Sequence, residues 1–548
     1  ENFNSNRYYI LTNQLSYNFD LSGHNFKVDA IYEIQDRKSD NVSLSLNSYV
    51  FDESINTVAG FFVPNSEYSP GGGIGQWRYL SYVGRINYNY KSKYYFTASL
   101  RRDGSSRFGP DFRYGVFPSF GSGWTLSEES FFAGVPYISF AKLRFGWGIT
   151  GSAEFGGDFP YVSTINGARE VQYPLGTDIN TVGGAALLLS SPNPSLRWEE
   201  VEQYNFGLDL NLFDDKIQTS VNYFIKNTND MILDVPLSLH SGLNVGSAQP
   251  PANIGKVQNK GLEFEILYKH LTASEFSFNV SANGTFLQNE VLQLADDPII
   301  GSQDGQTATW TDVGGTINAF YGFVSDGIIQ TEDELQDVAF YDFGGDIADQ
   351  PQLGDIKYRD LNGDGRITLD DRTYIGSIIP DFYGGINFDA NYKNWDFSMF
   401  FVVNVGNDVL NFTRRNLEIP GNIIQSNIKD YKKSVEALNY WTEDNPSDEI
   451  VRLKYNDFNN SRISSFWVED ASFARLQNVQ LGYNLPEEIL ETITLDRVRV
   501  YLSAVNLFTF TGYSGINPEV GGEGVTRGID NFQYPFTRQY LAGVQITF

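Results

Sequence analysis

The sequence predicts an all-β fold, a transmembrane antiparallel β-barrel with long extracellular loops. Three observations favour it: apolar and polar residues alternate over long segments, aromatic residues gather near segment ends, and short turns alternate with long connections. Aromatic residues make up 15% of the chain, while no apolar run approaches the ~20 residues that a membrane helix requires. Long, amphipathic, aromatic-rich strands are typical of outer-membrane barrels.

The alternation is clearest in three segments. In Tyr204–Phe213, YNFGLDLNLF, tyrosine, phenylalanine and leucine share one face, while asparagine, glycine and aspartate take the other. Gly384–Lys393 and Tyr540–Phe548 repeat this pattern. A soluble sandwich also alternates, but its strands are usually about five or six residues long. Many segments here reach about ten residues or more, enough to cross a bilayer at a tilt, so the barrel is favoured.

The alternation predicts about fifteen strands. Their approximate spans are 7–19, 24–36, 77–90, 93–107, 114–126, 138–150, 198–212, 216–233, 254–269, 275–288, 382–393, 395–406, 466–484, 496–510 and 535–548. An odd number of antiparallel strands cannot close, and single-chain bacterial barrels are even-numbered. The opening residues, ENFNSNRYYILTNQLSYNF, lack the pattern of a secretory leader. Both observations predict that the whole chain, 1–548, is the C-terminal portion of a larger barrel.

The connections predict the orientation of the barrel. Short turns such as FDLSGH and YKSK alternate with long, Gly-, Pro- and Asp-rich excursions. The long ones span approximately Ser39–Gly75, Ser152–Arg197, Pro236–Asn253, Asn289–Pro380, Asn407–Ser464 and Thr511–Phe536. By the outer-membrane convention the short turns are periplasmic and the long loops extracellular, so we expect the C-terminus to be periplasmic.

The excursion 289–380 is predicted to be an extracellular insertion. Its segment Gly314–Thr331 looks like a strand but would break the up-and-down count if it crossed the membrane. We therefore assign this segment to the insertion, and a true barrel strand with a miscount elsewhere is the alternative.

Within this insertion, residues 360–371, DLNGDGRITLDD, space oxygen donors like an EF-hand calcium loop. The predicted ligands are Asp360, Asn362, Asp364, Arg366 through its backbone carbonyl, Thr368 and Asp371. Aspartate in place of glutamate at the last position predicts weak, structural calcium binding, with a Kd of ~10⁻⁴–10⁻³ M as in extracellular modules. The alternative is an Asp- and Gly-rich turn that holds no metal.

Composition excludes several classes of function. The chain has 39 Lys+Arg against 67 Asp+Glu, a net charge of −28, so it lacks the basic surface that nucleic acid requires. It has no cysteine, which excludes disulfides and thiol catalysis. Its three histidines, His24, His240 and His270, are far apart in turn-like settings. With no nucleophile elbow, P-loop or recognisable carboxylate pair, no enzyme is predicted.

Several long segments resemble SusC/RagA-type TonB-dependent transporters of Bacteroidetes. They are Leu100–Phe132, Asn193–Phe224, Gly354–Phe388 and Ser503–Val520. The resemblance implies an outer-membrane barrel of about 22 strands with an N-terminal plug domain and a TonB box, neither of which is recognisable in this chain. It also implies coupling to TonB-ExbB-ExbD through that N-terminal region, and a SusD-like surface lipoprotein that caps the barrel and helps to capture glycans or peptides.

Two functions follow as hypotheses. The first is the barrel part of a TonB-dependent nutrient importer, taking up oligosaccharides or peptides. The second is a passive porin, or an outer-membrane scaffold of a secretion or adhesion machine. Loop aromatics such as Trp310, Tyr321, Tyr341 and Trp441 either stack on a sugar or, as is usual, pack the loops.

Overall fold

The structure is a computed structural model, and it describes most of the chain. The described residues are 2–46, 68–132, 134–155, 157–162, 165–166, 172–174, 182–184, 187–188, 192–234, 250–270, 275–295, 298–343, 350–419, 433–454, 458–493, 495–522 and 524–548. Most of the predicted excursion Pro236–Asn253 and much of Ser39–Gly75 and Ser152–Arg197 lie outside them.

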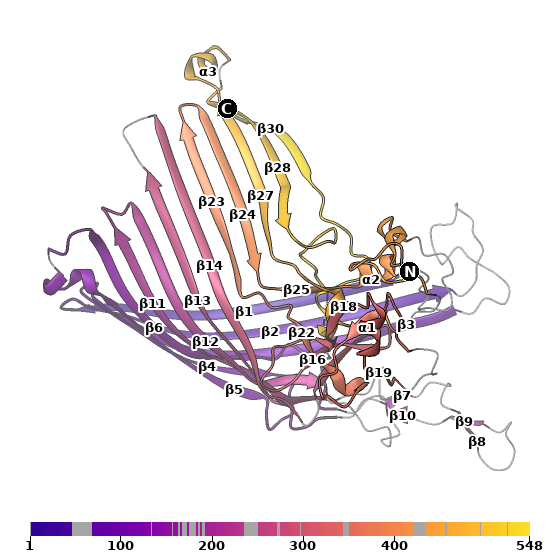
Figure 1. Cartoon of the computed structure of the whole chain (residues 1–548). Helices are drawn as coiled ribbons and strands as arrows, with labels where there is room; N and C mark the ends of the chain where they lie inside the picture. The colour runs from indigo at the N-terminus through magenta and orange to yellow at the C-terminus, as the bar shows by residue number, and fades with distance from the viewer. Residues whose placement is uncertain are drawn as a thin grey trace. The chain divides into compact units, whose positions relative to one another are not determined.

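Among the described residues, fifteen strands form one large antiparallel sheet (Figure 1). Its hydrogen-bonded order is β1-β2-β3-β4-β5-β6-β11-β12-β13-β14-β23-β24-β27-β28-β30. These strands are β1 Asn2–Leu21, β2 His24–Leu46, β3 Tyr68–Tyr90, β4 Tyr94–Ser105, β5 Tyr114–Thr125, β6 Ile138–Ser152, β11 Glu199–Leu212, β12 Ile217–Asp234, β13 Pro251–His270, β14 Phe276–Gln293, β23 Phe382–Tyr392, β24 Trp395–Val405, β27 Phe473–Asn484, β28 Arg497–Thr511 and β30 Gln539–Thr547. Each predicted span overlaps one of them, so the predicted strand pattern is confirmed.

The chain folds into two compact units. The first contains Glu1–Ala133, Lys142–Phe206 and Ile225–Val257, and the second contains Gly134–Ala141, Gly207–Phe224 and Gln258–Phe548.

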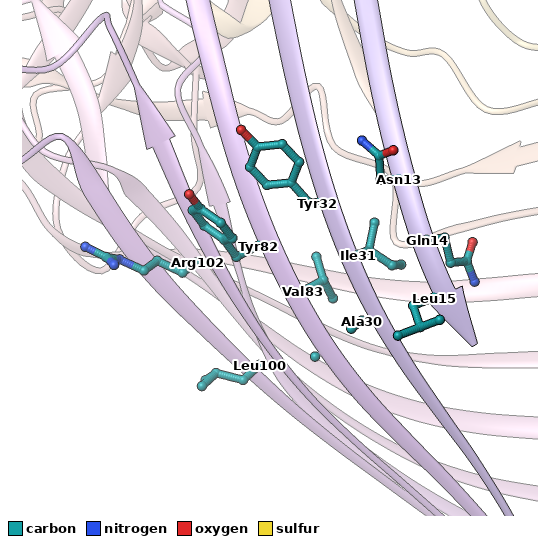
Figure 2. Close-up of a pocket in the computed structure, with 11 residues that line it drawn as sticks. Asn13, Gln14, Leu15, Ala30, Ile31, Tyr32, Tyr82, Val83, Leu100 and Arg102 are labelled. Atoms are coloured by element: carbon teal, nitrogen blue, oxygen red, sulfur yellow. The ribbon is translucent and has the colours of Figure 1, made fainter. Parts of the chain in front are cut away.

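In the first unit, the strand register divides the side chains into two faces. Leu15 pairs with Ala30, Ala30 with Gly84, and Gly84 with Leu100, so these four share one side, the apolar face (Figure 2). Leu15 is 73% exposed and Leu100 55% exposed. Apolar side chains that face outward from a sheet without a partner layer require lipid, as the alternation predicts.

The opposite side of the first unit is the polar face, and its side chains bond to one another. The Ser16 hydroxyl donates to Asp29 Oδ1 at 2.6 Å, and the Thr97 hydroxyl donates to Asn87 Oδ1 at 3.0 Å. Ser99 and Ser119 share a hydroxyl bond of 2.6 Å. These bonds satisfy polar groups within a face that water can reach, which is the arrangement of a barrel lumen.

Aromatic rings line the apolar face near the short turns. Phe19 and Phe26 stack with ring centroids 4.9 Å apart, and Tyr90 and Tyr94 with centroids 6.4 Å apart. Trp124 continues the row beside Tyr94 at 6.5 Å. Rings at this position form the interfacial girdle expected of an outer-membrane strand.

The second unit repeats the division into two faces. Ile386 pairs with Ala282 on β14 and Phe401 on β24, and it is 44% exposed on the apolar face. On the polar face, Arg499 donates to Asp396 Oδ1 at 2.9 Å and to Gln545 Oε1 at 3.1 Å.

Three connections of the second unit, between β14 and β23, between β24 and β27, and between β28 and β30, fold together as a loop subdomain. Its strands are β15 Ile299–Gln303, β16 Gln306–Thr311, β17 Ala319–Phe323, β18 Ser325–Ile328, β19 Phe340–Tyr341, β20 Ile356–Tyr358, β21 Arg366–Ile367, β22 Arg372–Gly376, β25 Asp408–Asn411, β26 Val468–Asp470 and β29 Ile529–Asp530. Its α-helices are α1 Glu332–Gln336 and α2 Phe412–Glu418, while α3 Glu487–Ile493 lies between β27 and β28. The first unit adds the short strands β7 Ile165–Asn166, β8 Gln172–Pro174, β9 Val182–Gly184 and β10 Leu187–Leu188.

The segment Gly314–Thr331 belongs to this subdomain and adds no strand to the large sheet. Within it, β17 pairs with β16 and β22, and β18 pairs with β20. The up-and-down strand count of the large sheet therefore stands without it.

The loop subdomain has a core of its own. Phe320, Ile356, Leu410 and Ile529, drawn from all three connections, are buried in one apolar cluster around Trp467. No helix in the described part of the chain has both the length and the apolar character to cross a membrane.

Candidate functional site

A cavity of about 720 Å³ opens on the polar face of the first unit. Its lining residues are Tyr8, Gln35, Arg37, Trp77, Tyr79, Ser81, Arg101, Asp103, Arg107, Gly151, Ser152, Ala153, Glu154, Phe155 and Trp198. Strands β1 to β4 place the first eight on one side, because Tyr8 pairs with Arg37, Arg37 with Trp77, and Ser81 with Asp103. The cavity therefore combines aromatic walls with several arginines and two carboxylates.

The arginines of the cavity are held in place. Arg101 Nε donates to both carboxylate oxygens of Asp103, at 2.6 and 2.8 Å, and its Nη2 donates to Ser81 at 3.0 Å. Arg107 Nη1 donates to the Ala153 carbonyl at 2.8 Å. Fixed guanidinium groups bind planar acceptors such as carboxylates without a further cost of ordering.

Two polar donors of the cavity residues have no hydrogen-bond partner within the described part of the chain. They are Trp77 Nε1 and Arg107 Nε, both buried. The Arg107 guanidinium lies 5.6 Å from the Trp77 ring centre and 5.9 Å from that of Phe155. Because buried polar groups are nearly always bonded, such donors point to a binding role.

An apolar cluster borders the cavity and shares the lining residues Phe155 and Trp198 with it. Phe108 and Leu196 are fully buried against Trp198, whose indole nitrogen donates to the Arg113 carbonyl at 3.3 Å. The two segments that supply this cluster, around Phe108 and around Trp198, belong to two of the sequence blocks that resemble SusC/RagA-type transporters. The sequence pattern alone does not predict this cavity. Its signal was the run of alternating Trp77, Tyr79 and Ser81, but only the strand register brings these residues to Arg101 and Asp103.

The predicted calcium loop forms a compact turn in the loop subdomain. Asp360 accepts from the Gly363 and Gly365 nitrogens at 2.7 Å each, and these hydrogen bonds lower the pKa of the exposed Asp360 carboxyl. Both glycines have positive φ, +76° and +79°, which L side chains rarely adopt. Asn362 and Asp364 accept from the Asp364 and Arg366 nitrogens at 2.9 and 2.8 Å.

The direction of the Arg366 carbonyl follows from the pairing of the residues around it. The residues on either side of Arg366 use their carbonyls for pairing, because Gly365 O accepts from Phe340 and Ile367 O accepts from Asp342. Successive carbonyls of an extended segment alternate in direction, so that of Arg366 faces away from β19.

The two remaining predicted ligands are bonded to each other instead. Thr368 caps the short helix Leu369–Asp371, and the Thr368 nitrogen donates to Asp371 Oδ2 at 2.7 Å. The other Asp371 oxygen accepts from the Leu361 nitrogen at 2.9 Å. Among the described residues, no group of three or more His, Asp or Glu side chains is arranged to hold a metal. The structure therefore holds Asp360, Asn362 and Asp364 in one turn and bonds Thr368 to Asp371.

Of the four loop aromatics named above, two are buried and two are half-buried. Tyr341 and Trp441 are buried in the core, where the Tyr341 hydroxyl donates to the Ile356 carbonyl and Trp441 Nε1 donates to Gln330. Trp310 and Tyr321 stack on each other with ring centroids 4.7 Å apart. Tyr341 and Trp441 therefore serve packing rather than sugar stacking.

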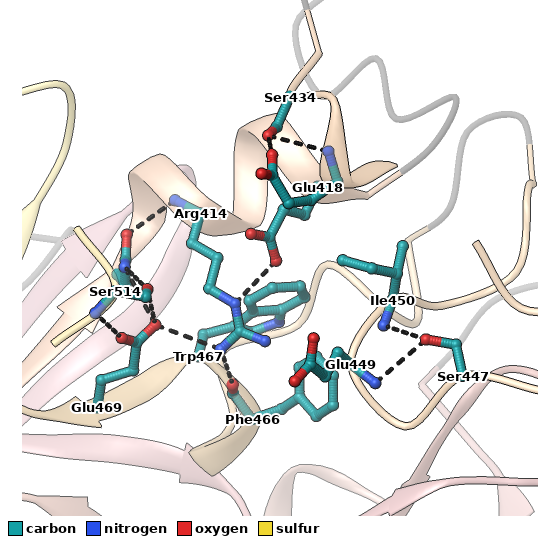
Figure 3. Close-up of polar contacts among 12 residues, drawn as sticks. Arg414, Glu418, Ser434, Ser447, Glu449, Ile450, Phe466, Trp467, Glu469 and Ser514 are labelled. Atoms are coloured by element: carbon teal, nitrogen blue, oxygen red, sulfur yellow. Dashed lines mark hydrogen bonds and ion pairs between the residues drawn. The ribbon is translucent and has the colours of Figure 1, made fainter. Parts of the chain in front are cut away.

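A polar network stabilises the loop subdomain around Arg414 (Figure 3). Arg414 donates to Glu418 at 2.8 Å and to Glu469 at 3.3 Å. Glu469 also accepts from the Ser514 hydroxyl at 2.9 Å. Burial raises the pKa of Glu418, and the ion pair with Arg414 opposes this effect. These contacts join the connection between β24 and β27 to the connection between β28 and β30, so the network is structural.

A sheet of long strands with one polar face and one exposed apolar face is the fold of a transmembrane β-barrel. A family model described as TonB dependent receptor-like, beta-barrel, matches residues 1–507. The chain belongs to this family.

Individual proteins of known family are also similar to this chain. TonB-dependent receptor P3 of Formosa agariphila is 31% identical over 551 residues, 98% of this chain and 52% of that receptor. TonB-dependent receptor SusC of Bacteroides thetaiotaomicron is 30% identical over 483 residues, 86% of this chain and 44% of that receptor. The solved structure of the RagAB peptide transporter matches with a TM-score of 0.81 at 24% identity, over 100% of this chain and 56% of that one. The predicted SusC/RagA resemblance is confirmed, and the chain spans about half the length of these relatives.

Proposed function

We propose that this chain is the barrel part of a TonB-dependent outer-membrane importer that takes up oligosaccharides or peptides. The cavity on the polar face carries the proposal, because its aromatic walls and fixed arginines suit hydroxyl- and amide-rich cargo. Support also comes from a relative named SusC and from the fold shared with the RagAB peptide transporter. In this proposal the short turns are periplasmic, the loops extracellular, and a SusD-like lipoprotein covers the loops.

Uptake by the full-length protein tests this proposal. We expect cells to accumulate a labelled oligopeptide or oligosaccharide only when TonB is present. TonB-independent uptake would instead show the passive porin that is the alternative function. Trp77→Ala and Arg101→Gln should raise the half-saturating cargo concentration about tenfold, which corresponds to about 1.4 kcal/mol. Arg78→Gln is the matched control, because Arg78 lies on the opposite face and pairs with Asp36.

We further propose that the loop 360–371 holds a structural calcium ion. Asp360, Asn362, Asp364 and the Arg366 carbonyl would hold it, and Thr368 with Asp371 would close the loop behind it. Four oxygens of this kind in one turn suit a hard cation, with water completing the coordination. The ion would supply positive charge that tightens the turn, and no catalytic step is assigned to it.

Limited proteolysis with and without a chelator tests the calcium proposal. We expect the double variant Asp360→Ala, Asp364→Ala to make the loop subdomain protease-sensitive in calcium while the barrel still assembles. At a calcium concentration 100 times the Kd, the bound ion would add about 2.7 kcal/mol to stability. Asp370→Ala, an exposed aspartate outside the predicted ligand positions, is the control. Equal cleavage of the wild type with and without chelator would contradict the proposal that the loop binds calcium.

A further inference from the structure

The apolar face of the first unit carries a groove of about 690 Å³ across β1 to β4 (Figure 2). Two rows of paired residues line it, with Gln14, Ile31 and Val83 between them along the strands. The first row is Leu15, Ala30, Gly84 and Leu100, and the second, nearer the long connections, is Asn13, Tyr32, Tyr82 and Arg102. The groove exists because the two central residues of the first row are the smallest, while leucines stand on both sides of them.

The second row ends in an arginine without a counter-charge. The Arg102 guanidinium lies 4.5 Å from the Tyr114 ring centre, and within the described part of the chain it makes no ion pair. Other arginines on this face are paired: Arg7 lies 3.8 Å from Asp40 and Arg78 lies 2.8 Å from Asp36. A cation beside lipid is costly unless an anion or water reaches it, so this position attracts a negative headgroup.

The depth of the groove suits an anchored lipid. Arg102 follows Tyr94 of the short-turn girdle by eight residues along β4, or about 20 Å across the membrane for a strand tilted by ~40°. The hydrophobic band of such barrels is about 25 Å tall. Arg102 therefore lies near the interface on the long-loop side, and the leucine row lies in the hydrocarbon.

We propose that this groove binds one membrane lipid with a phosphate headgroup. An acyl chain lies along Ala30 and Gly84 between the two leucines, and the phosphate binds the Arg102 guanidinium, which matches phosphate geometry. The Tyr82 hydroxyl and the Asn13 amide, in the same row, face the polar part of the lipid. The phosphate of this lipid lies in the outer leaflet if the long loops are outside the cell, and that orientation rests on the proposed function.

Native mass spectrometry of the full-length protein tests this assignment. The purified protein is stripped of lipid in detergent and then offered dimyristoyl phosphatidic acid or, as the uncharged match, dimyristoylglycerol. We expect one tightly held phosphatidic acid and about tenfold weaker retention of dimyristoylglycerol. Arg102→Gln should remove this preference. Gly84→Leu should block both lipids, because a Cβ at Gly84 meets no atom within 4 Å and the rest of the leucine side chain would occupy the groove.

Two controls keep the test specific. Arg78→Gln removes a paired arginine of the same face, and Ala98→Leu enlarges a small residue one row below the groove, so neither should change retention. Equal lipid retention by Gly84→Leu and wild type would overturn the proposal. A dimer of the chain that Gly84→Leu abolishes, with no bound lipid, would overturn it in favour of a second copy. Cargo uptake is measured separately, so loss of transport with intact lipid binding would count against the proposed function alone.

Discussion

The large sheet and the loop subdomain remove their apolar side chains from water in opposite ways. In the sheet, the apolar side chains remain exposed on one face, as with Ile86 at 50% exposure, and their partner is the hydrocarbon of a membrane. In the loop subdomain, Trp467 is 1% exposed and Arg415 0% exposed, as in the core of a water-soluble domain. The comparison teaches that one chain uses lipid and protein as alternative solvents for its apolar residues.

The buried arginine shows how far the subdomain core resembles a soluble one. Arg415 donates to the Ser461 carbonyl at 2.8 Å and to Asp304 Oδ2 at 2.5 Å, and it lies over the Phe412 ring. Burial lowers the pKa of Arg415 to about 10, although the Asp304 carboxylate opposes that shift. A charge can be buried here only because these partners are fixed.

The largest expected effect breaks the core of the loop subdomain. Trp467→Ala removes a fully buried side chain whose indole nitrogen donates to the Asn460 carbonyl at 3.1 Å. We expect it to cost about 3–5 kcal/mol of local stability, and to make the subdomain protease-sensitive. The barrel should keep its folded mobility on unheated gels, because the sheet does not draw on this core. Loss of the folded barrel band would show that the two regions do not fold separately.

A charge introduced into the sheet should destabilise the barrel strongly on the apolar face and much less on the polar face. Ile86→Lys places a cation in the hydrocarbon and should destabilise the barrel by about 2–4 kcal/mol if it lies near the midplane. Asn87→Lys, the next residue on the polar face, should cost much less. Unfolding in urea in the presence of lipid vesicles measures both, and equal losses would contradict the assignment of the two faces.

The sequence predicted the strands because alternation records which side of each strand meets lipid. Alternation does not predict the full length of the strands: it predicts an end of β2 near residue 36, but the strand continues to Leu46. Beyond Asp36 the alternation ends, since Asp36, Lys38 and Asp40 on the outer side are charged, yet the backbone keeps its pairing with β3. Hydrogen bonds between strands leave no trace in residue type.

The core of the loop subdomain could not be predicted from the sequence, for a different reason. Phe320, Leu410 and Ile529 come from three separate connections, and no periodicity relates them. From its residue type Arg415 is expected at the surface. Only the structure shows that it is buried against its partners Asp304 and Ser461. The calcium loop is the opposite case, because all its predicted donors lie within twelve consecutive residues, and spacing alone suggested their arrangement.

High pH should weaken the loop subdomain before the sheet. Burial raises the pKa of Tyr513, which donates to Asp530 Oδ2 at 2.6 Å. Because the folded pKa exceeds the ordinary value of about 10, the folded state holds the proton more tightly, and stability is lost as the pH rises above that value. Tyr513→Phe should cost about 1 kcal/mol at neutral pH and flatten this alkaline decline. Protease sensitivity measured from pH 8 to 11 gives both, and an unchanged decline would contradict the role of Tyr513.

The smallest expected effect concerns an ion pair on the outer rim of the sheet. Arg78 Nε lies 2.8 Å from Asp36, with the two side chains 65% and 31% exposed. Water and salt screen such a pair, so its coupling in a double-mutant cycle of Arg78→Gln and Asp36→Asn should be about 0–1 kcal/mol and should fall at high ionic strength. The cycle is measured by urea unfolding at two salt concentrations. A larger, salt-independent coupling would mean that water does not reach this rim, and that the ion pair is desolvated as Arg415 is in the loop subdomain.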